Sequence, residues 1–259
     1  MSQELLIERR GPTAWLTINR PEVRNALGLA VTKQIATTLR ELSGDRNTRV
    51  IVLTGAGDRV FVSGADVREF KEHLATPETA LKYDAAAEEL QSALRAASQP
   101  VIARINGHAV GSGTIVAASC DFRITVRQAK FGIPVAKFGF IAPLPDTLRL
   151  IQLIGPANTK KMLMTAALIE ADTAKAIGLV DQVVDSNNLD TAVGELADAL
   201  ATNAPLTLKV TKQMIEQLNA PTSDVMAGAK WYQEIFRSRD FKEGLDAFLT
   251  KRKPEFTGE

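Results

Sequence analysis

The sequence predicts an α/β fold, for three reasons. Apolar runs typical of buried strands, at residues 50–54 and 101–105, are separated by a long helical pattern. Both strands are followed by glycine-containing turns that lead into a helix. After residue 188 no strand candidate remains, and only helical patterns follow. We therefore expect an α/β core over residues 1–188 and a helical C-terminal region over residues 189–259.

The elements of the core are expected in the following order. Two short apolar strands flank Gly11-Pro12 and predict a hairpin. The next helix has Ile35, Leu39 and Leu42 on one face and ends at a Ser-Gly pair. The remaining elements are a short strand at 60–62, a long helix from Thr76-Pro77 onwards, a strand at 122–126, a helix at about 147–153 that ends at Gly155, and a short helix, glycine stop and strand over 174–184.

The C-terminal region is expected to hold three or four helices. Breaks between them are indicated at Asn203-Ala204-Pro205, Ala220-Pro221 and Ser238-Arg239-Asp240. No internal repeat of fixed period accompanies them.

The composition excludes several classes of protein. The 259 residues are 45% hydrophobic, which suffices for a sizeable core, and the net charge of +1 gives no basic surface for nucleic acid or anionic lipid. One cysteine excludes an internal disulfide, and two histidines offer no zinc cluster. No apolar run approaches the ~20 residues of a membrane span, and the first ten residues do not resemble a signal peptide. We expect a cytoplasmic protein that contacts neither membrane nor nucleic acid.

The most informative stretch joins the strand at 101–105 to an alanine-rich segment. An Asn106-Gly107 turn follows the strand, and two further glycines then flank Ser112. Glycine permits the sharp bend, and the first turn of a helix has N–H groups without internal partners. Those N–H groups suit an anion or an oxygen that becomes one. The alternative is that the glycines only permit a tight turn and close packing.

A second stretch repeats this arrangement. The strand at 50–54 and the short strand at 60–62 lead to Ser63-Gly64-Ala65, placed before another helix start. Two such N–H groups from separate segments, if they converge, form an oxyanion hole.

Three segments, in this order and spacing, resemble the enoyl-CoA hydratase/isomerase (crotonase) superfamily: Arg20–Leu27, Phe61–Val67 and Asn106–Gly113. The resemblance extends over essentially the whole chain. It implies a spiral of strand-strand-helix turns followed by a C-terminal helical region that makes trimer contacts. It also implies an acyl-CoA substrate, no separate cofactor because coenzyme A is part of the substrate, and a homotrimer or dimer of trimers. One scaffold in this superfamily supports several reactions, so the resemblance leaves the reaction open.

The resemblance assigns roles to particular residues. The backbone N–H groups of Ala65 and Ser112 match the two oxyanion-hole donors, with Ser112 where glycine is usual. Arg24, Ala26 and Leu27 match a segment that runs beside coenzyme A, although a lone exposed arginine needs no ligand.

Four residues near the C-terminus match a segment that reaches a neighbouring subunit's coenzyme A in related enzymes. They are Phe248, Lys251, Arg252 and Lys253. The alternative is an ordinary charged helix end.

Two expected glutamates are missing. Standard hydratases of the superfamily use two glutamates to hold and protonate water, and the matching positions carry Ile115 and Val135. Neither side chain can transfer a proton, which general acid–base catalysis requires, so the residues at these positions disfavour efficient hydration by the usual mechanism, and both are assigned to the acyl pocket.

Asp146 is the one carboxylate in the loop that departs from the superfamily's pattern. In an apolar pocket its pKa would rise and it could transfer a proton, but an Asp at a helix start is more often an N-cap. We favour the cap, and likewise interpret Asp66 as a cap and His108 as a turn residue that points away from the site.

Three functions are consistent with these residues. The first is an acyl-CoA enzyme that stabilises a thioester enolate without the two glutamates, as a decarboxylase or as an atypical hydratase or isomerase. The second is an oligomer that binds acyl-CoA without turnover. The third, a dinucleotide enzyme, is disfavoured because Val116 occupies the third glycine position of G-x-G-x-x-G.

Overall fold

A computed structural model describes residues 3–69, 77–139, 141–219 and 238–259. Its largest feature is a six-stranded sheet in the order β1-β2-β3-β5-β7-β10. The first two strands form the expected antiparallel hairpin, and the other neighbours are parallel. The strands are β1 (Leu5–Arg10), β2 (Thr13–Ile18), β3 (Val50–Gly55), β5 (Val101–Ile105), β7 (Phe122–Val126) and β10 (Gln182–Val184).

A second, smaller sheet has the order β4-β6-β8-β9. Its strands are β4 (Val60–Val62), β6 (His108–Val110), β8 (Lys130–Gly132) and β9 (Ile169–Glu170). The chain thus places β4 after β3, β6 after β5 and β8 after β7, so each of these turns contributes one strand to each sheet. This confirms the predicted alternation of strands and helices.

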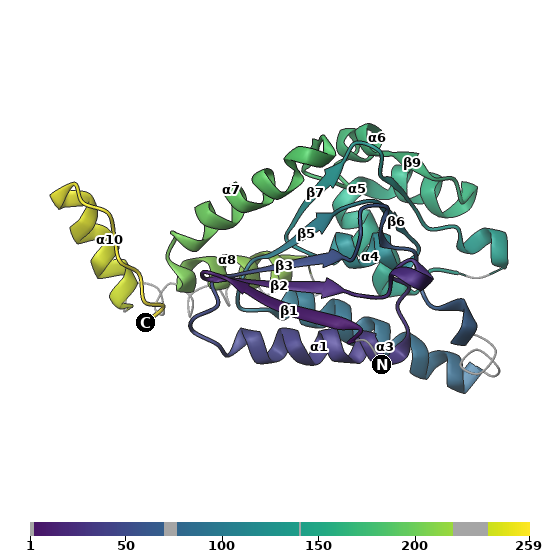
Figure 1. Ribbon diagram of the computed structural model, residues 1–259, viewed down its shortest axis with the longest axis horizontal. Coiled ribbons are helices and arrows are strands. Elements are labelled where there is room, and N and C mark those ends of the chain that lie inside the picture. The colour runs from purple at the N-terminus through teal and green to yellow at the C-terminus, as the bar shows by residue number, and fades with distance from the viewer. Residues whose placement is uncertain (1–2, 70–76, 140, 220–237) are drawn as a thin grey trace.

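Helices cover the larger sheet on both sides. The helix α1 (Leu29–Ser43) packs against α3 (Pro77–Ala96) on one side, and α7 (Leu189–Ala201) crosses the other (Figure 1). The predicted apolar face of α1 is buried, with Ile35 and Leu39 fully inaccessible. The other helices are α4 (Ser112–Ser119), α5 (Leu144–Thr165), α6 (Ala171–Ala176), α8 (Pro205–Leu218) and α10 (Arg239–Thr250), with the 3-10 turns η1 (Pro21–Val23), η2 (Val67–Glu69), η3 (Val135–Phe138) and η4 (Ser186–Asn188).

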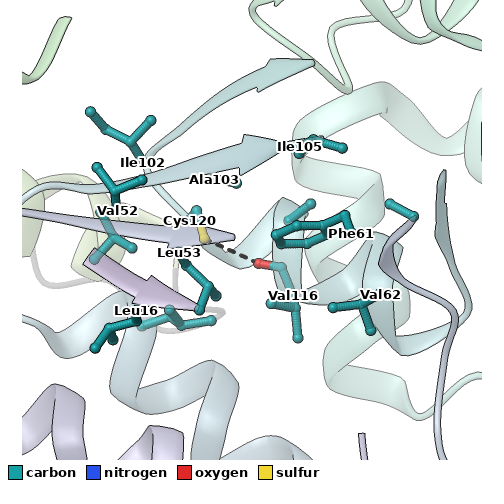
Figure 2. Close-up of a cluster of buried hydrophobic side chains, with 14 of the residues drawn as sticks. Leu16, Val52, Leu53, Phe61, Val62, Ile102, Ala103, Ile105, Val116 and Cys120 are labelled. Atoms are coloured by element: carbon teal, nitrogen blue, oxygen red, sulfur yellow. Dashed lines mark hydrogen bonds between the residues drawn. The ribbon is translucent and has the colours of Figure 1, made fainter. Parts of the chain in front are cut away.

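The hydrophobic core joins the larger sheet to the elements that carry the glycine-containing turns. Figure 2 shows Leu53 of β3 and Ile102 of β5 in the same cluster as Phe61 of β4 and Val116 of α4. Cys120 ends α4 in this cluster, and its thiol donates to the Val116 carbonyl over 3.3 Å. Because both turns start from this rigid core, their positions relative to each other are fixed.

The helix α5 differs from its expected extent. It begins at Leu144, three residues earlier than expected, and continues to Thr165 through a kink at Gly155, where φ is 75° and ψ is 162°. The predicted stop at Gly155 is therefore a real interruption, and Pro156 starts a second helical segment, a position at which proline is favoured. The Ala220-Pro221 break lies outside the described residues.

The helices of the C-terminal region lie in different parts of the molecule. Leu189 and Val193 of α7 belong to the main hydrophobic core, whereas α10 lies apart from both sheets at one end of the molecule (Figure 1). The division into residues 1–188 and 189–259 stays a prediction. None of the described helices is long and apolar enough to cross a membrane.

Candidate active site

The two glycine-containing turns lie against each other. Strand β4 pairs with β6 in parallel, with Val62 opposite Ala109, so both strands end at the same edge of the smaller sheet. A Cβ atom on Gly111 would lie only 3.5 Å from Gly64 Cα. Both glycines have positive φ, 122° for Gly64 and 57° for Gly111, which side chains disfavour. The two glycine-containing turns therefore meet at this edge of the smaller sheet.

Glycine at position 113 is required for this contact. A Cβ atom there would lie 2.2 Å from the Val62 carbonyl oxygen, far inside any contact distance. The first turn of α4 consequently packs directly on β4.

Each turn presents a backbone N–H group without a partner. Around Ala65, the neighbouring backbone is bonded to Leu27: Leu27 N–H donates to the Gly64 carbonyl over 2.8 Å, and Asp66 N–H donates to the Leu27 carbonyl over 2.9 Å. Ser112 is the first residue of α4, so its N–H precedes the helical hydrogen bonds. Within the described parts of the chain, neither the Ala65 nor the Ser112 N–H has a hydrogen-bond acceptor.

Ala65 and Ser112 line one small cavity of about 30 Å³. Its wall also includes apolar side chains of Leu27, Leu90 and Val116. Two polar residues of α3, Tyr83 and Gln91, also line the cavity. Among the described residues that line it, none carries a carboxylate.

Asp66 holds the first turn in place. Its carboxylate pairs with Arg20 at 2.9 Å and with Arg68 at 2.6 Å, and its side chain is 4% exposed. It also accepts the Arg68 N–H at 3.2 Å, which confirms its expected capping role, here at η2. Hydrogen bonds from the Arg68 side chain are the main reason that the pKa of Asp66 lies well below its usual value. The ion pairs were not foreseen.

Asp146 is not the N-cap of its helix. Pro143 is the N-cap of α5, Asp146 is the third residue of the helix, and no side-chain capping bond is present there. The interpretation that we favoured from the sequence is therefore wrong, because the helix starts two residues before Asp146.

The surroundings of Asp146 favour its protonated form. Burial raises the pKa of its carboxyl to about 6, and the charges of Glu88 and Asp84 act in the same direction. A hydrogen bond from Gln91 and the charge of Arg95 oppose this shift without cancelling it. Gln91, one of the groups that influence the pKa of Asp146, also lines the cavity.

Gln91 was missed at the level of sequence. It lies four residues after Ala87 and three before Leu94, on the buried face of α3, and is 4% exposed. A glutamine on an otherwise apolar helical stripe was the available signal.

Ile115 and Val135 do not line the cavity as described. Ile115 is 2% exposed and belongs to the hydrophobic core, while its neighbour Val116 faces the cavity. Val135, in η3, packs against the same core. Their assignment to an acyl pocket stays a prediction.

A larger hollow of about 870 Å³ opens beside the two turns. It is lined by Arg24 and Arg59, by the acidic residues Glu22 and Asp58, and by His108. The His108 Nδ1 atom accepts the Lys130 N–H at 3.1 Å, which leaves Nε2 as the nitrogen that carries the proton in the neutral ring. His108 lies in β6 and not in a turn, and it lines this hollow and not the described wall of the small cavity. Arg59 was not predicted, although a basic residue in a glycine-containing turn is a sequence signal.

The remaining predicted residues divide into two groups. Ala26 and Leu27 are buried beside the first turn, and Leu27 lines the small cavity. Lys251 follows α10 and is exposed, and α10 lies far from α4 and β6 within one chain (Figure 1). Phe248 is in α10, and its side chain lies outside what the structure describes.

Comparison with known proteins gives the same family as the resemblance found in the sequence. The family model described as enoyl-CoA hydratase/isomerase matches residues 8–259. The chain is 36% identical over 253 residues to the short-chain-enoyl-CoA hydratase of Clostridium acetobutylicum, covering 97% of this chain and 96% of that protein. It is 34% identical over 260 residues to the 2,3-dehydroadipyl-CoA hydratase of Escherichia coli, covering 98% and 99%.

A solved structure from Magnetospirillum magneticum, described as an enoyl-CoA hydratase/carnithine racemase, superposes with a TM-score of 0.95 at 35% identity. The match covers 100% of this chain and 97% of that one. An enoyl-CoA hydratase from Bacillus anthracis gives a TM-score of 0.91 at 31% identity, covering 99% and 100%.

Proposed function

The chain belongs to the enoyl-CoA hydratase/isomerase family, and from this membership we propose that its small cavity stabilises the enolate of an acyl-CoA thioester. The observation that carries the proposal is the pair of unpartnered N–H groups, from Ala65 and Ser112, on one cavity wall. Donors fixed in this way stabilise negative charge that develops on a carbonyl oxygen, each by about 2.7–4 kcal/mol. The acyl-CoA substrate is consistent with the names of the relatives.

The outer hollow would take the nucleotide part of the substrate. Arg24 and Arg59 are the described cations on its wall, and guanidinium groups bind phosphate oxygens well. Coenzyme A would then extend past Ser63 and Val110, which also line the hollow and directly precede the two glycines. No separate cofactor enters this scheme.

Asp146 is the first candidate for the proton carrier. With its pKa raised to about 6, it can both accept and release a proton near neutral pH. In an isomerisation, Asp146 would take a proton from the substrate, directly or through one water. The electrons of the broken C–H bond would move to the thioester oxygen, and the proton would return at a different carbon.

Decarboxylation is the second candidate, favoured by the lack of a carboxylate among the described residues of the cavity wall. The bond to the carboxylate would break, CO₂ would leave, and its electron pair would form the same enolate. A proton from solvent would then complete the product.

Turnover of three substrates separates these reactions. Crotonyl-CoA reports hydration, a 3-enoyl-CoA reports isomerisation, and methylmalonyl-CoA reports CO₂ release. We expect Asp146→Asn to lower kcat for hydration or isomerisation by about 10²- to 10⁴-fold, the usual contribution of an acid–base group. Asp185→Asn, on an exposed residue, is the matched control.

Two results would contradict parts of this scheme. CO₂ release that is unaffected by Asp146→Asn would leave the enolate mechanism intact and remove Asp146 from it. Binding of all three esters without any turnover would show a protein that binds acyl-CoA and does not catalyse.

A homotrimer or dimer of trimers is proposed for the assembly. The amphipathic helix α10 lies away from the rest of its own chain in Figure 1, a position from which it could contact a neighbouring subunit. Sedimentation equilibrium that gave a monomer at micromolar concentration would contradict this.

A further inference from the structure

Thr114 is a buried polar residue in an otherwise apolar stretch of α4. It is fully inaccessible to solvent, and the residues that follow it, Ile115, Val116 and Ala117, belong to the hydrophobic core. A hydroxyl group buried without a hydrogen-bond partner costs free energy, so the partners of this hydroxyl are what its position in the helix depends on.

The Thr114 hydroxyl joins α4 to two strands of the smaller sheet. Its Oγ1 atom lies 2.7 Å from the Ala109 carbonyl oxygen of β6 and 3.1 Å from the Gly132 carbonyl oxygen of β8. It also accepts the Gly132 N–H over 3.2 Å. Because a hydroxyl has one proton and can accept as well, it donates to one of these carbonyls while it accepts from Gly132. One side chain therefore attaches the start of α4 to β6 and β8.

The residue before Ser112 is attached to the same strand. Gly111 N–H donates to the Gly132 carbonyl over 2.8 Å. Ser112 thus lies between two residues, Gly111 and Thr114, that are both hydrogen-bonded to Gly132. These bonds restrict the movement of Ser112 relative to the smaller sheet.

The backbone of Thr114 determines the direction of the Ser112 N–H group. Thr114 N–H donates to the Gly111 carbonyl over 3.0 Å. That carbonyl and the Ser112 N–H belong to one peptide unit, which is planar and trans, so the two groups point in opposite directions. A Gly111 carbonyl held toward the body of α4 therefore turns the Ser112 N–H away from the helix.

We propose that Thr114 is a positioning residue: its hydroxyl holds the first turn of α4 on β6 and β8 and thereby aims the Ser112 N–H at the thioester oxygen. The inference rests on the proposed function, in which this N–H is an oxyanion donor. Such a donor acts at about 2.7–3.1 Å from the developing charge, so a small shift of the turn weakens it. A misplacement of about 1 Å can lower a rate by about 10²-fold.

Two variants of Thr114 separate the hydroxyl from the shape of the side chain. Thr114→Val keeps the shape and lacks the hydroxyl, whereas Thr114→Ser keeps the hydroxyl. On the ester that the wild-type protein turns over, we expect Thr114→Val to lower kcat about 10- to 100-fold and to change KM less than about threefold, because the donor acts mainly in the transition state. Thr114→Ser should retain kcat within about threefold of the wild-type value.

An infrared measurement reports on the donor directly. The probe is butyryl-CoA with an isotope label in the thioester carbonyl, an ester that has neither a double bond to hydrate or move nor a carboxylate to lose. Hydrogen bonds to a carbonyl oxygen lower its stretching frequency, so the labelled band should lie lower in the wild-type complex than in solution. Thr114→Val should shift the band back toward its value in solution, and Thr114→Ser should not.

Thr159→Val controls for the loss of a buried threonine hydroxyl. Thr159 is 2% exposed and its hydroxyl donates to the Gly155 carbonyl over 2.8 Å, but it lines neither the small cavity nor the outer hollow. This variant should leave both kcat and the carbonyl band unchanged. If circular dichroism shows that Thr114→Val does not fold, Thr114→Ala gives the same comparison, because it also lacks the hydroxyl and requires less space.

The outcomes separate this inference from the proposed function. A wild-type carbonyl frequency in folded Thr114→Val would overturn the inference, whatever its kcat, and would leave the oxyanion donors in place. An equal loss of kcat in Thr159→Val would also overturn it, because the loss would then reflect stability alone. If the band of the wild-type complex lies at its value in solution, the proposed function fails and the inference fails with it.

Discussion

Asp146 shows how the surroundings of one carboxyl link function to stability. Its pKa is raised from 3.8 to about 6, chiefly by burial, so the native state binds this proton more tightly than the unfolded state. Between these two pKa values the native state holds more protons, and the free energy of unfolding therefore falls as pH rises. Above pH 6 the carboxyl is ionised in both states, and its burial lowers the free energy of unfolding by the full amount. Such a cost at a site is typical of a residue retained for function.

Replacing Asp146 should therefore stabilise the protein. We expect Asp146→Asn to increase the free energy of unfolding at pH 7.5 by on the order of 1–2 kcal/mol and to change it little below pH 4, as measured by urea denaturation. Asp185→Asn, at an exposed position, should have no such effect. A loss of about 1 kcal/mol at pH 7.5 would instead indicate a capping residue and contradict the structure.

The sequence could place some of these residues and not others. Ala65 and Ser112 could be found because glycines beside them mark positions where the backbone must bend. Asp146 was misinterpreted because its role depends on where α5 begins, and helix ends are poorly determined by local pattern. Gln91 gave only the signal of a polar residue in an apolar stripe, and its place on the cavity wall depends on the packing of α3 against α4.

The turn from Ser63 to η2 is an element whose position depends on one buried ion pair. Asp66 and Arg20 have side-chain exposures of 4% and 8%, and Asp66 directly follows Ala65. Arg20 also pairs with Glu4 at 2.9 Å, but the Glu4 side chain is 40% exposed, so removal of Asp66 takes away the buried carboxylate that compensates the Arg20 charge.

We expect Asp66→Asn to lower the free energy of unfolding by about 3 kcal/mol at pH 7, measured by chemical denaturation. The lowered pKa of Asp66 means that its stabilisation is present above its unfolded pKa of about 4 and disappears as the pH falls below that value. Arg68→Ala is the comparison, because Arg68 is 61% exposed and its pair should contribute less than about 1 kcal/mol. Equal losses for the two variants would show that burial of the Arg20 pair is unimportant.

Element boundaries were predictable where one residue determines them. Gly44 ends α1 as expected, and Gly155 interrupts α5 at the predicted place. The helical segment after Gly155 was missed because Gly155 was interpreted as the end of the helix, whereas Pro156, at a first helical position, starts a new segment.

At the scale of the whole molecule, the site exists because the chain passes repeatedly from a strand of the larger sheet to a strand of the smaller one. The alternation of strands and helices predicts an α/β class, but it does not specify the strand order β1-β2-β3-β5-β7-β10 or the pairing of β4 with β6. That pairing brings Gly64 next to Gly111 although they are 47 positions apart in the chain. The resemblance to a known family supplied this arrangement in advance, and local physical reasoning alone did not.

The N–H of Ser112 tests the central claim most directly. Ser112 is the first residue of α4, where proline is favoured, so Ser112→Pro removes one unpartnered N–H with little demand on the helix. Ser112→Gly keeps the N–H, and both variants lack the hydroxyl, so their comparison isolates the donor.

The decisive measurement is kcat for both variants on whichever ester of the substrate panel the wild-type protein turns over, with circular dichroism to confirm folding. The account predicts that Ser112→Pro is about 10²- to 10³-fold slower than Ser112→Gly, the usual effect of one oxyanion donor. Equal kcat values for two folded variants would contradict the assignment of this N–H to the developing negative charge.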